Sequence, residues 1–517
     1  MTPFARLRPL ALGLALALSV QSLGVQAQAN PPAAPQRLPH IGDGNSMSIA
    51  QERRLGESIM RQLMTDADYL DDPVLIDYLQ GIWGPLRDAA KQLGQLQPEV
   101  DEAFAWDLLL VRDKSVNAFA LPGGFMGVHL GLIAVVANRD ELASVMGHEL
   151  SHVSQRHIAR MQEQQGRQTP WLVGAMILGV LAASRSPDAA NAMIVGGTAS
   201  VAQGQLNFSR DMEREADRLG FNVMTQAGFE SQGMVGMFQK LAQASRLNDS
   251  GGFPYLRSHP LTTERIADMQ SRIGLTDAAM LSTSVEHAMM SARARGLMAT
   301  HVDEVQKLVL ALEQDFKPDL PLAKKAALLY AGVMAYTQQR QAAKARDAMT
   351  QLLQITSEDP AGFRAAQWLA ADTERRLGAA AGCVGKLPAQ ASDRARVLLL
   401  AQCRLDMRQT EATKNASDAL QMWLGQYPRD GLAWDLVSQA YAQSGDKLRA
   451  LRADAESRAV RWDEQGAIDR LRAAQALSKN LAKQGQLDRA GNMEASIIDS
   501  RLRALEAVRR ELLHPQN

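Results

Sequence analysis

The sequence contains little cysteine and no excess of charge of either sign, and each absence excludes a class of function. Lysine plus arginine and aspartate plus glutamate both total 56 among the 517 residues, so the formal net charge is zero. Such a chain has no bulk electrostatic attraction for nucleic acid, and we expect no nucleic-acid partner. The two cysteines, Cys383 and Cys403, have no histidine near them in the sequence, so neither resembles a catalytic nucleophile.

The N-terminal apolar run is also too short to be a stable membrane span. It extends from Pro9 to Val20, follows Arg6 and Arg8, and precedes Ala27–Gln28–Ala29, which has the small-x-small form that signal peptidase cleaves. We therefore expect residues 1–29 to be a signal peptide that is cleaved after Ala29. The mature protein is then periplasmic.

The mature chain divides into a leader and two parts of different character, within the two to four domains that its length predicts. Residues 30–46, rich in proline, alanine and glycine, are expected to form a flexible leader. Residues 47–300 have helical periodicity, interrupted between Phe104 and Val128 by three short β-like runs. Residues 305–517 are dominated by short helical segments. The predicted fold is mainly α, with a small β-sheet in the first part and an α-helical solenoid in the second.

The second part resembles tetratricopeptide repeats. The spacing W-x6-Y-x3-G-x4-A is matched by Trp434, Tyr441, Gly445 and Ala450. Pro360 and Pro428 are 68 positions apart, which is twice the repeat length of about 34. Stacked helix pairs of this kind form a curved surface that docks proteins, whereas the alternative is an irregular helical bundle.

Cys383 and Cys403 both lie in this second part, in a compartment that permits disulfides. If they occupy adjacent antiparallel helices, their Cα atoms can approach closely enough for a bridge. The alternative is that both are small buried apolar side chains.

The strongest chemical signal is the sequence His148-Glu149-Leu150-Ser151-His152, an H-E-x-x-H motif in a helical segment. Because a helix has 3.6 residues per turn, both histidines lie on one face and can reach one metal ion. Glu149 then flanks the open coordination position, where a general base is required.

A third metal ligand is expected on a neighbouring element. Glu213 and Asp217 are four positions apart on a second predicted helix, so one can bind the metal while the other orients a ligating histidine. We assign Glu213 as the ligand and Asp217 as the orienting residue. Glu215 lies on another side of that helix and is expected to be solvated or paired with an arginine.

Together with Asn117-Ala118-Phe119 upstream and Ser258-His259-Pro260-Leu261 downstream, these motifs resemble the HtpX/Ste-type gluzincin metallopeptidases. The resemblance implies a gluzincin peptidase domain over residues 47–300, with one zinc ion held by His148, His152 and Glu213 and catalysis by Glu149. The signal peptide and the repeats make the chain most similar to the periplasmic protease-chaperones of outer-membrane β-barrel assembly.

Two roles remain open for His259, which by the resemblance lies near the metal. Its imidazole either fills the fourth zinc position and keeps the enzyme latent, or it stabilises the oxyanion. Arg265 either serves that electrostatic role or pairs with an acid on its own helix. His157 follows His152 by five positions, which rotates it off the ligand face of a continuous helix, so we expect a structural role for it.

Residues around Asn117, Ala118 and Phe119 are predicted to form an edge strand that holds an extended substrate by strand addition. The alternative is an ordinary strand of the sheet. Two uncharged or nearly uncharged apolar segments, 171–183 and 189–202, follow the metal-binding motif. We interpret them as a helical hairpin that covers the active-site cleft or touches a membrane face or a client barrel, with core burial as the alternative.

The sequence thus predicts a periplasmic zinc endopeptidase whose repeat domain docks it to the outer-membrane assembly machinery. Its substrates are unfolded, misfolded or stalled outer-membrane proteins, and it has a chaperone-like role in their quality control. The alternative is a repeat-based binding module or chaperone in which the zinc site is latent or structural. An intact Glu149 argues against a purely structural site, because structural zinc has four closed protein ligands and needs no base.

Overall fold

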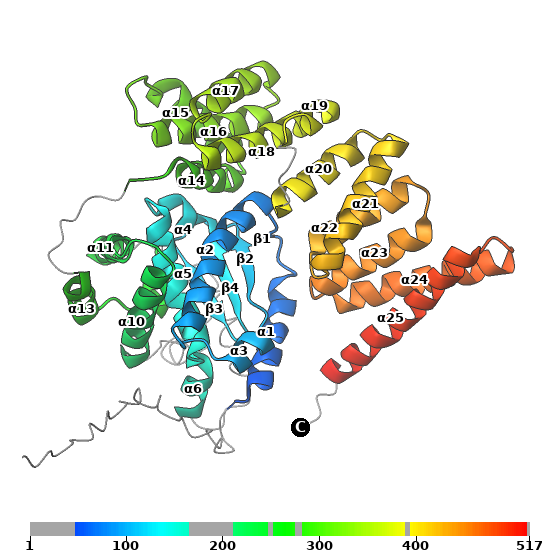
Figure 1. The fold of residues 1–517 in the computed structure, drawn as a ribbon, viewed down its shortest axis with the longest axis horizontal. Coiled ribbons are helices and arrows are strands. Elements are labelled where there is room, and N and C mark those ends of the chain that lie inside the picture. Colours follow the sequence, from blue (N-terminus) through cyan, green and yellow to red (C-terminus); the bar gives the residue numbers. More distant parts are fainter. Residues whose placement is uncertain (1–46, 165–209, 247–251, 274–281, 388–392, 514–517) are drawn as a thin grey trace, which may run out of the picture. The chain divides into compact units, whose positions relative to one another are not determined.

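The computed structural model describes residues 47–164, 210–246, 252–273, 282–387 and 393–513. The expected signal peptide (1–29), the leader (30–46) and the apolar segments 171–183 and 189–202 lie outside the described residues. Within the described ranges, no helix combines the length and the apolar character that a membrane span requires. Figure 1 shows this part of the chain as mostly helical with a small sheet, as the sequence predicts.

The sheet has four strands, and its order places one predicted strand at an edge. The strands are β1 (Tyr69–Leu70), β2 (Asp107–Val111), β3 (Ala118–Leu121) and β4 (Phe125–His129). Their order is β1-β2-β4-β3, with β2 parallel to β4 and the other two pairs antiparallel. The β3–β4 turn uses Gly123 and Gly124 at φ of 80° and 83°, a region that glycine enters without a Cβ clash. β3 is therefore an edge strand, as expected for this segment.

Local sequence signals explain where the first helices begin. α1 (Ile49–Leu63) follows Ser48, which forms a capping box with Gln51. α2 (Pro73–Gln92) follows Asp72, whose carboxylate accepts a hydrogen bond from the backbone N–H of Leu75. The other helices of the first part are α3 (Pro98–Ala103), α4 (Leu130–Val135), α5 (Arg139–Ser154), α6 (His157–Gln164), α10 (Arg210–Gln226), α11 (Gln232–Arg246), α12 (Tyr255–Ser258) and α13 (Thr263–Ile273).

Helix α5 is buried along almost its whole length and carries the predicted metal-binding motif. It packs against α2, α10, α11 and β3. Helix α10 approaches α5 closely because two glycines meet at the crossing. A Cβ added at Gly220 would lie only 2.9 Å from the backbone nitrogen of His148 and 3.0 Å from the carbonyl carbon of Gly147. This close backbone approach brings the acidic residues of α10 within reach of the histidines of α5.

The remaining described elements, from the end of the first part through the second part, are all helices. They are α14 (Val285–Met298), α15 (Val302–Asp315), α16 (Leu322–Gln338), α17 (Ala342–Ile355), α18 (Pro360–Arg376), α19 (Ala380–Val384), α20 (Arg394–Asp406), α21 (Thr410–Gln426), α22 (Gly431–Gln443), α23 (Lys447–Val460), α24 (Glu464–Lys483) and α25 (Arg489–Leu513). From α20 to α25, each helix packs against the next one in the chain, as in stacked helical repeats. Their assignment as tetratricopeptide repeats and the boundary at residues 300–305 remain predictions.

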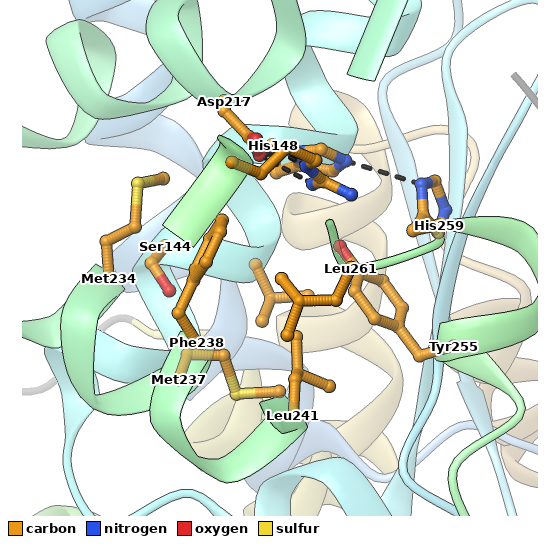
Figure 2. A pocket seen from close by; sticks show the side chains of 12 residues that line it. Ser144, His148, Asp217, Met234, Met237, Phe238, Leu241, Tyr255, His259 and Leu261 are labelled. Carbon is orange, nitrogen blue, oxygen red and sulfur yellow. Dashed lines mark hydrogen bonds and ion pairs between the residues drawn. The ribbon is translucent and has the colours of Figure 1, made fainter. Parts of the chain in front are cut away.

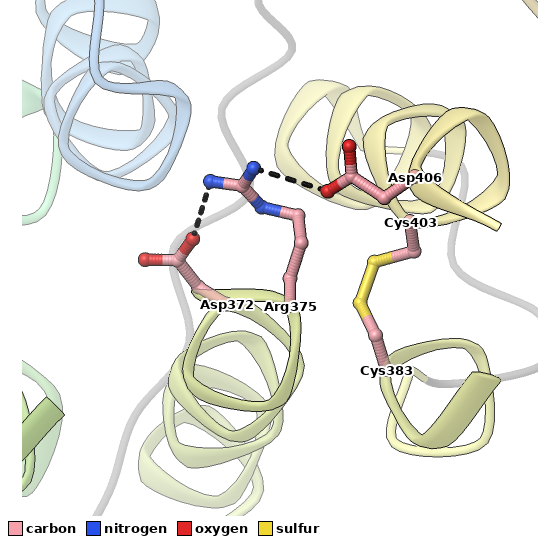
Figure 3. The surroundings of a disulfide bond; sticks show 5 residues. All are labelled: Asp372, Arg375, Cys383, Cys403 and Asp406. Atoms are coloured by element: carbon pink, nitrogen blue, oxygen red, sulfur yellow. Dashed lines mark hydrogen bonds and ion pairs between the residues drawn. A yellow bond between two sulfur atoms is a disulfide. The ribbon is translucent and has the colours of Figure 1, made fainter. Parts of the chain in front are cut away.

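Cys383 of α19 and Cys403 of α20 are joined by a disulfide, with Cα atoms 5.9 Å apart (Figure 3). Both cysteines are fully buried beside Ala371 of α18. The two cysteines thus lie on neighbouring helices, as the disulfide hypothesis requires. Nearby, Arg375 of α18 forms ion pairs with Asp372 at 3.1 Å and with Asp406 of α20 at 3.4 Å.

Candidate metal centre

Helix α5 presents two histidines from adjacent turns. The helix begins after Asn138, whose side chain accepts a hydrogen bond from the backbone N–H of Glu141. The helical repeat places His148 and His152 on one face, and their Nε2 atoms lie 3.0 Å apart. Both side chains are buried.

Two side chains from other elements complete a group of four donors. Glu213 comes from α10, and His259 immediately follows α12. The Nδ1 atom of His259 lies 3.3 Å from Nε2 of His148 and 2.9 Å from Oε1 of Glu213. The Oε1 atom of Glu213 lies 3.4 Å from Nε2 of His152. The four ligand atoms are within 4.8 Å of one another, and all four residues are buried.

This donor set fits a divalent metal ion. Imidazole nitrogens and a carboxylate oxygen are the ligands that zinc-type sites use, and a buried cluster of such groups gains from a shared cation. Glu149 stands beside the cluster, with Oε1 at 3.4 Å from Nε2 of His259. That Oε1 atom is buried and accepts no hydrogen bond from the described residues. The site therefore combines converging donors with an adjacent carboxylate oxygen that is free to take a proton.

Asp217 and Arg265 support the cluster from outside. Asp217 Oδ1 lies 2.9 Å from Nδ1 of His148, on the opposite side of the ring from the donor group. This is the geometry predicted for an orienting carboxylate. Arg265 donates to both oxygens of Asp217, at 2.6 and 2.7 Å, and its Nη1 lies 2.8 Å from Oε2 of Glu213. The expectation that Arg265 pairs with an acid on its own helix is wrong, because it pairs with acids of α10.

The charges of the three central carboxyl groups are set differently by their surroundings. Burial raises the pKa of Glu213, but His259 and His148 outweigh it and hold that pKa well below 4.5. Burial likewise opposes ionisation of Asp217, but Arg265 and His148 lower its pKa below the usual value. For Glu149, burial dominates over His259 and His148 and raises the pKa above 4.5. Glu213 and Asp217 are thus carboxylates, whereas Glu149 is the group with increased proton affinity.

His157 contacts the site, which the sequence did not predict. Its Nδ1 lies 2.9 Å from Nδ1 of His152, and its Nε2 lies 3.2 Å from Oε2 of Glu215. The expectation of a continuous helix fails here because α5 ends at Ser154 and α6 begins at His157. Glu215 also pairs with Arg160 at 2.8 Å, in agreement with the arginine partner expected for it.

Tyr255 is a second contact that the sequence did not reveal. Its ring stacks on His259 with centroids 4.6 Å apart, and its hydroxyl is hydrogen-bonded to Glu149. Figure 2 shows both residues at a pocket that adjoins His148 and Asp217. The far wall of this pocket is apolar and is formed by Met234, Met237, Phe238, Leu241 and Leu261.

The predicted substrate strand lies against the metal-binding helix, since β3 packs on α5. Asn117 and Ala118 are buried, and Phe119 is half-buried. The Phe119 ring covers Gly127 of β4, where a Cβ would come within 2.1 Å of that ring. The strand is therefore in the expected place, and its binding of substrate remains a prediction.

Comparison with known proteins agrees with this geometry. The sequence pattern of Peptidase family M48 matches residues 87–273, which contain all four candidate ligands and Glu149. Residues 87–273 therefore match an M48 peptidase domain. The chain is accordingly a metalloprotease, and the expected resemblance to this group of peptidases is confirmed.

Relatives of the M48 domain extend beyond it into the helical second part. A beta-barrel assembly-enhancing protease of Yersinia pestis is 29% identical over 490 residues, covering 93% of this chain and 94% of the relative. The protein of the same name from Escherichia coli is 28% identical over 447 residues, covering 86% and 88%. The yeast mitochondrial metalloendopeptidase OMA1, from Saccharomyces cerevisiae, is 28% identical over 218 residues, covering 41% and 60%. Similarity to the first two therefore includes the helical second part.

Proposed function

We propose that this chain is a periplasmic zinc endopeptidase that degrades misfolded or stalled outer-membrane proteins and supports their assembly. The observation that carries the proposal is the convergence of His148, His152 and Glu213 beside Glu149, whose raised pKa suits a general base. Zinc is the proposed metal because two or three imidazoles with one carboxylate and an adjacent glutamate suit a catalytic zinc site.

In the proposed reaction, His148, His152 and Glu213 would hold one zinc ion per chain. When bound, zinc supplies Lewis acidity that activates water and polarises a peptide carbonyl. Glu149 takes the proton of the attacking water on its free oxygen and then delivers it to the leaving amine. Asp217 keeps the His148 ring in place through Nδ1, so that Nε2 faces the other donors and would be available to a metal.

Substrate would lie extended along β3, adding a strand at this edge of the sheet. The edge position of β3 and its packing on α5 support this placement. Residues 117–119 would then contribute mainly backbone hydrogen bonds, as any edge strand does when a further strand is added to it. Such recognition suits unfolded chains, because backbone groups are the same in every sequence.

The helical second part is the proposed docking domain for the outer-membrane assembly machinery. Its support is the stacked arrangement of α20 to α25 and the similarity of this region to the assembly-enhancing proteases. The signal-peptide pattern in residues 1–29 supports export to the periplasm. Peripheral contact with a membrane remains part of the proposal and rests on the apolar segments 171–183 and 189–202.

A second function is favoured by one observation, the position of His259 within the donor group. If His259 fills the remaining coordination position, the site is latent and the repeat surface does the principal work as a chaperone. Relief of latency then requires His259 to move away.

The experiment that tests the proposal compares the purified full-length mature protein with Glu149→Gln. Zinc content and hydrolysis of a fluorescently labelled unfolded protein are measured on both. The variant should retain one zinc per chain and lose hydrolysis, because the ligands remain and the base is removed. The matched control is Glu99→Gln, which changes an exposed glutamate of α3 and should leave both properties unchanged. Full activity of zinc-loaded Glu149→Gln would reject the mechanism.

A further inference from the structure

Arg156 has a backbone conformation that arginine rarely adopts. Its φ is 52°, in the left-handed region, where a side chain with a Cβ costs about 1–2 kcal/mol. It stands between the end of α5 at Ser154 and the start of α6 at His157. A left-handed residue ends a helix, and Arg340 and Arg408 do the same after α16 and α20.

The side-chain contacts of Arg156 reach α1 and the residue Met47 just before it. Arg156 Nε donates to Oε2 of Glu52 at 2.7 Å, and Nη2 donates to the backbone carbonyl of Met47. Glu52 is only 2% exposed, so the pair is partly shielded from water and screening. The break between α5 and α6 is therefore held by a helix 104 positions away in the sequence.

The consequence of the break is the position of His157. In a continuous helix, a residue five positions after His152 is rotated by about 140° from it and cannot meet its ring. After the break, the two rings have centroids 4.8 Å apart at 81°, and their Nδ1 atoms lie 2.9 Å apart. His157 itself is fully buried.

The distances allow one consistent arrangement of protons along this chain of groups. His152 directs Nε2 into the donor group, so Nε2 must be free of a proton to bind a metal and Nδ1 must carry one. That Nδ1–H can donate to Nδ1 of His157, whose own proton is then on Nε2 and faces the carboxylate of Glu215. The two histidines of the motif are thus supported in parallel, His148 by Asp217 and His152 by His157 with Glu215.

We propose that the break at Arg156 exists to make His157 a positioning residue for the metal ligand His152. His157 and Glu215 hold the ring orientation and the tautomer of His152, and Glu52 on α1 holds the break. This inference rests on the proposed metal site but does not require hydrolysis. It assigns a metal-site function to α1, which lies outside the region that matches the M48 family.

The test is zinc affinity, measured on the full-length mature protein by competition with a chromophoric chelator. His157→Ala should weaken zinc binding by about 10- to 100-fold, the range typical when a partner of a ligating histidine is lost. His157→Asn should recover part of the loss, because its side-chain oxygen can accept the proton of His152. Glu215→Ala should weaken binding by about 10-fold.

The control is Met161→Ala, which truncates a buried apolar side chain of α6 that makes none of the hydrogen bonds described above. It should lower the melting temperature and leave zinc affinity unchanged. Unchanged affinity in both His157→Ala and Glu215→Ala would overturn the inference. An equal loss of zinc affinity in Met161→Ala would also overturn the inference, since the loss would then come from general destabilisation of α6.

Because affinity is measured without turnover, the outcome is separate from that of the Glu149→Gln experiment. If His157→Ala does not fold, the zinc affinities of Glu215→Ala and His157→Asn test the inference in its place. Activity of Glu149→Gln would reject the catalytic mechanism and leave this inference intact.

Discussion

The Nδ1 atom of His259 lies 2.9 Å from Oε1 of Glu213, so a histidine from a loop after α12 occupies the same donor group as the third expected ligand. The other ring nitrogen of His259, Nε2, lies 3.4 Å from Oε1 of Glu149. A side chain in this position competes with water for the metal and with substrate for the base. The arrangement favours the gating role of His259 over the oxyanion role.

Removal of His259 therefore should increase proteolysis. His259→Ala opens the fourth coordination position, and the rate on the same unfolded substrate at matched zinc occupancy is expected to rise. A loss of about 100- to 1000-fold would instead identify His259 as an oxyanion donor. Tyr255→Phe is a useful companion, because it keeps the ring stacked on His259 while removing the hydroxyl that contacts Glu149.

Two glutamates of α10 should respond differently to truncation. Glu213→Ala removes a direct ligand and should weaken zinc binding by more than about 100-fold, beyond the range expected for outer contacts such as Glu215. Equilibrium dialysis against buffered zinc measures the zinc occupancy of Glu213→Ala and Glu215→Ala. The ligand assignment is wrong if Glu213→Ala keeps full zinc occupancy while Glu215→Ala loses it.

The Cys383–Cys403 disulfide should form after export and stabilise the second part of the chain. The bridge closes a loop over a sequence separation of 20, for which the chain-entropy argument predicts about 3 kcal/mol of stabilisation. The double variant Cys383→Ser, Cys403→Ser should unfold at lower denaturant concentration than the oxidised protein. Thiol labelling of the denatured, unreduced protein is the direct check, and two free thiols per chain would rule the bridge out.

Asp77 is expected to destabilise the protein at neutral pH. Burial raises its pKa from 3.8 to about 6, although its Oδ2 accepts a hydrogen bond at 2.7 Å from the backbone N–H of Ala395. The folded state therefore binds the Asp77 proton more tightly than the unfolded state. This contribution is fully present below pH 3.8 and is lost as the pH rises through about 6.

Asp77→Asn keeps an acceptor for Ala395 and cannot ionise. Its stability relative to the natural protein should be similar near pH 4 and greater by about 1–3 kcal/mol at pH 7.5. Urea denaturation at the two pH values measures the difference. Asp88→Asn, at an exposed position of the same helix, is the control and should show no such pH dependence. An equal difference at both pH values would contradict the prediction.

The sequence alone determined the parts of the site that depend on local geometry. His148 and His152 face one metal because four positions make about one helical turn, and Glu213 and Asp217 share a face of α10 for the same reason. The two strands on either side of the Gly123–Gly124 turn were also predictable, since the turn and the apolar runs around it are local signals. These features need no knowledge of distant contacts.

The tertiary structure decided the features that depend on long-range contacts. The sequence could name His259 but not place its Nδ1 beside Glu213, and it could not pair Arg265 with acids of α10. The contact of His157 with His152 was not predictable, because helical periodicity assumes an unbroken helix. The break depends on a left-handed residue, Arg156, held by Glu52 from α1, and periodicity along α5 carries no information about that contact.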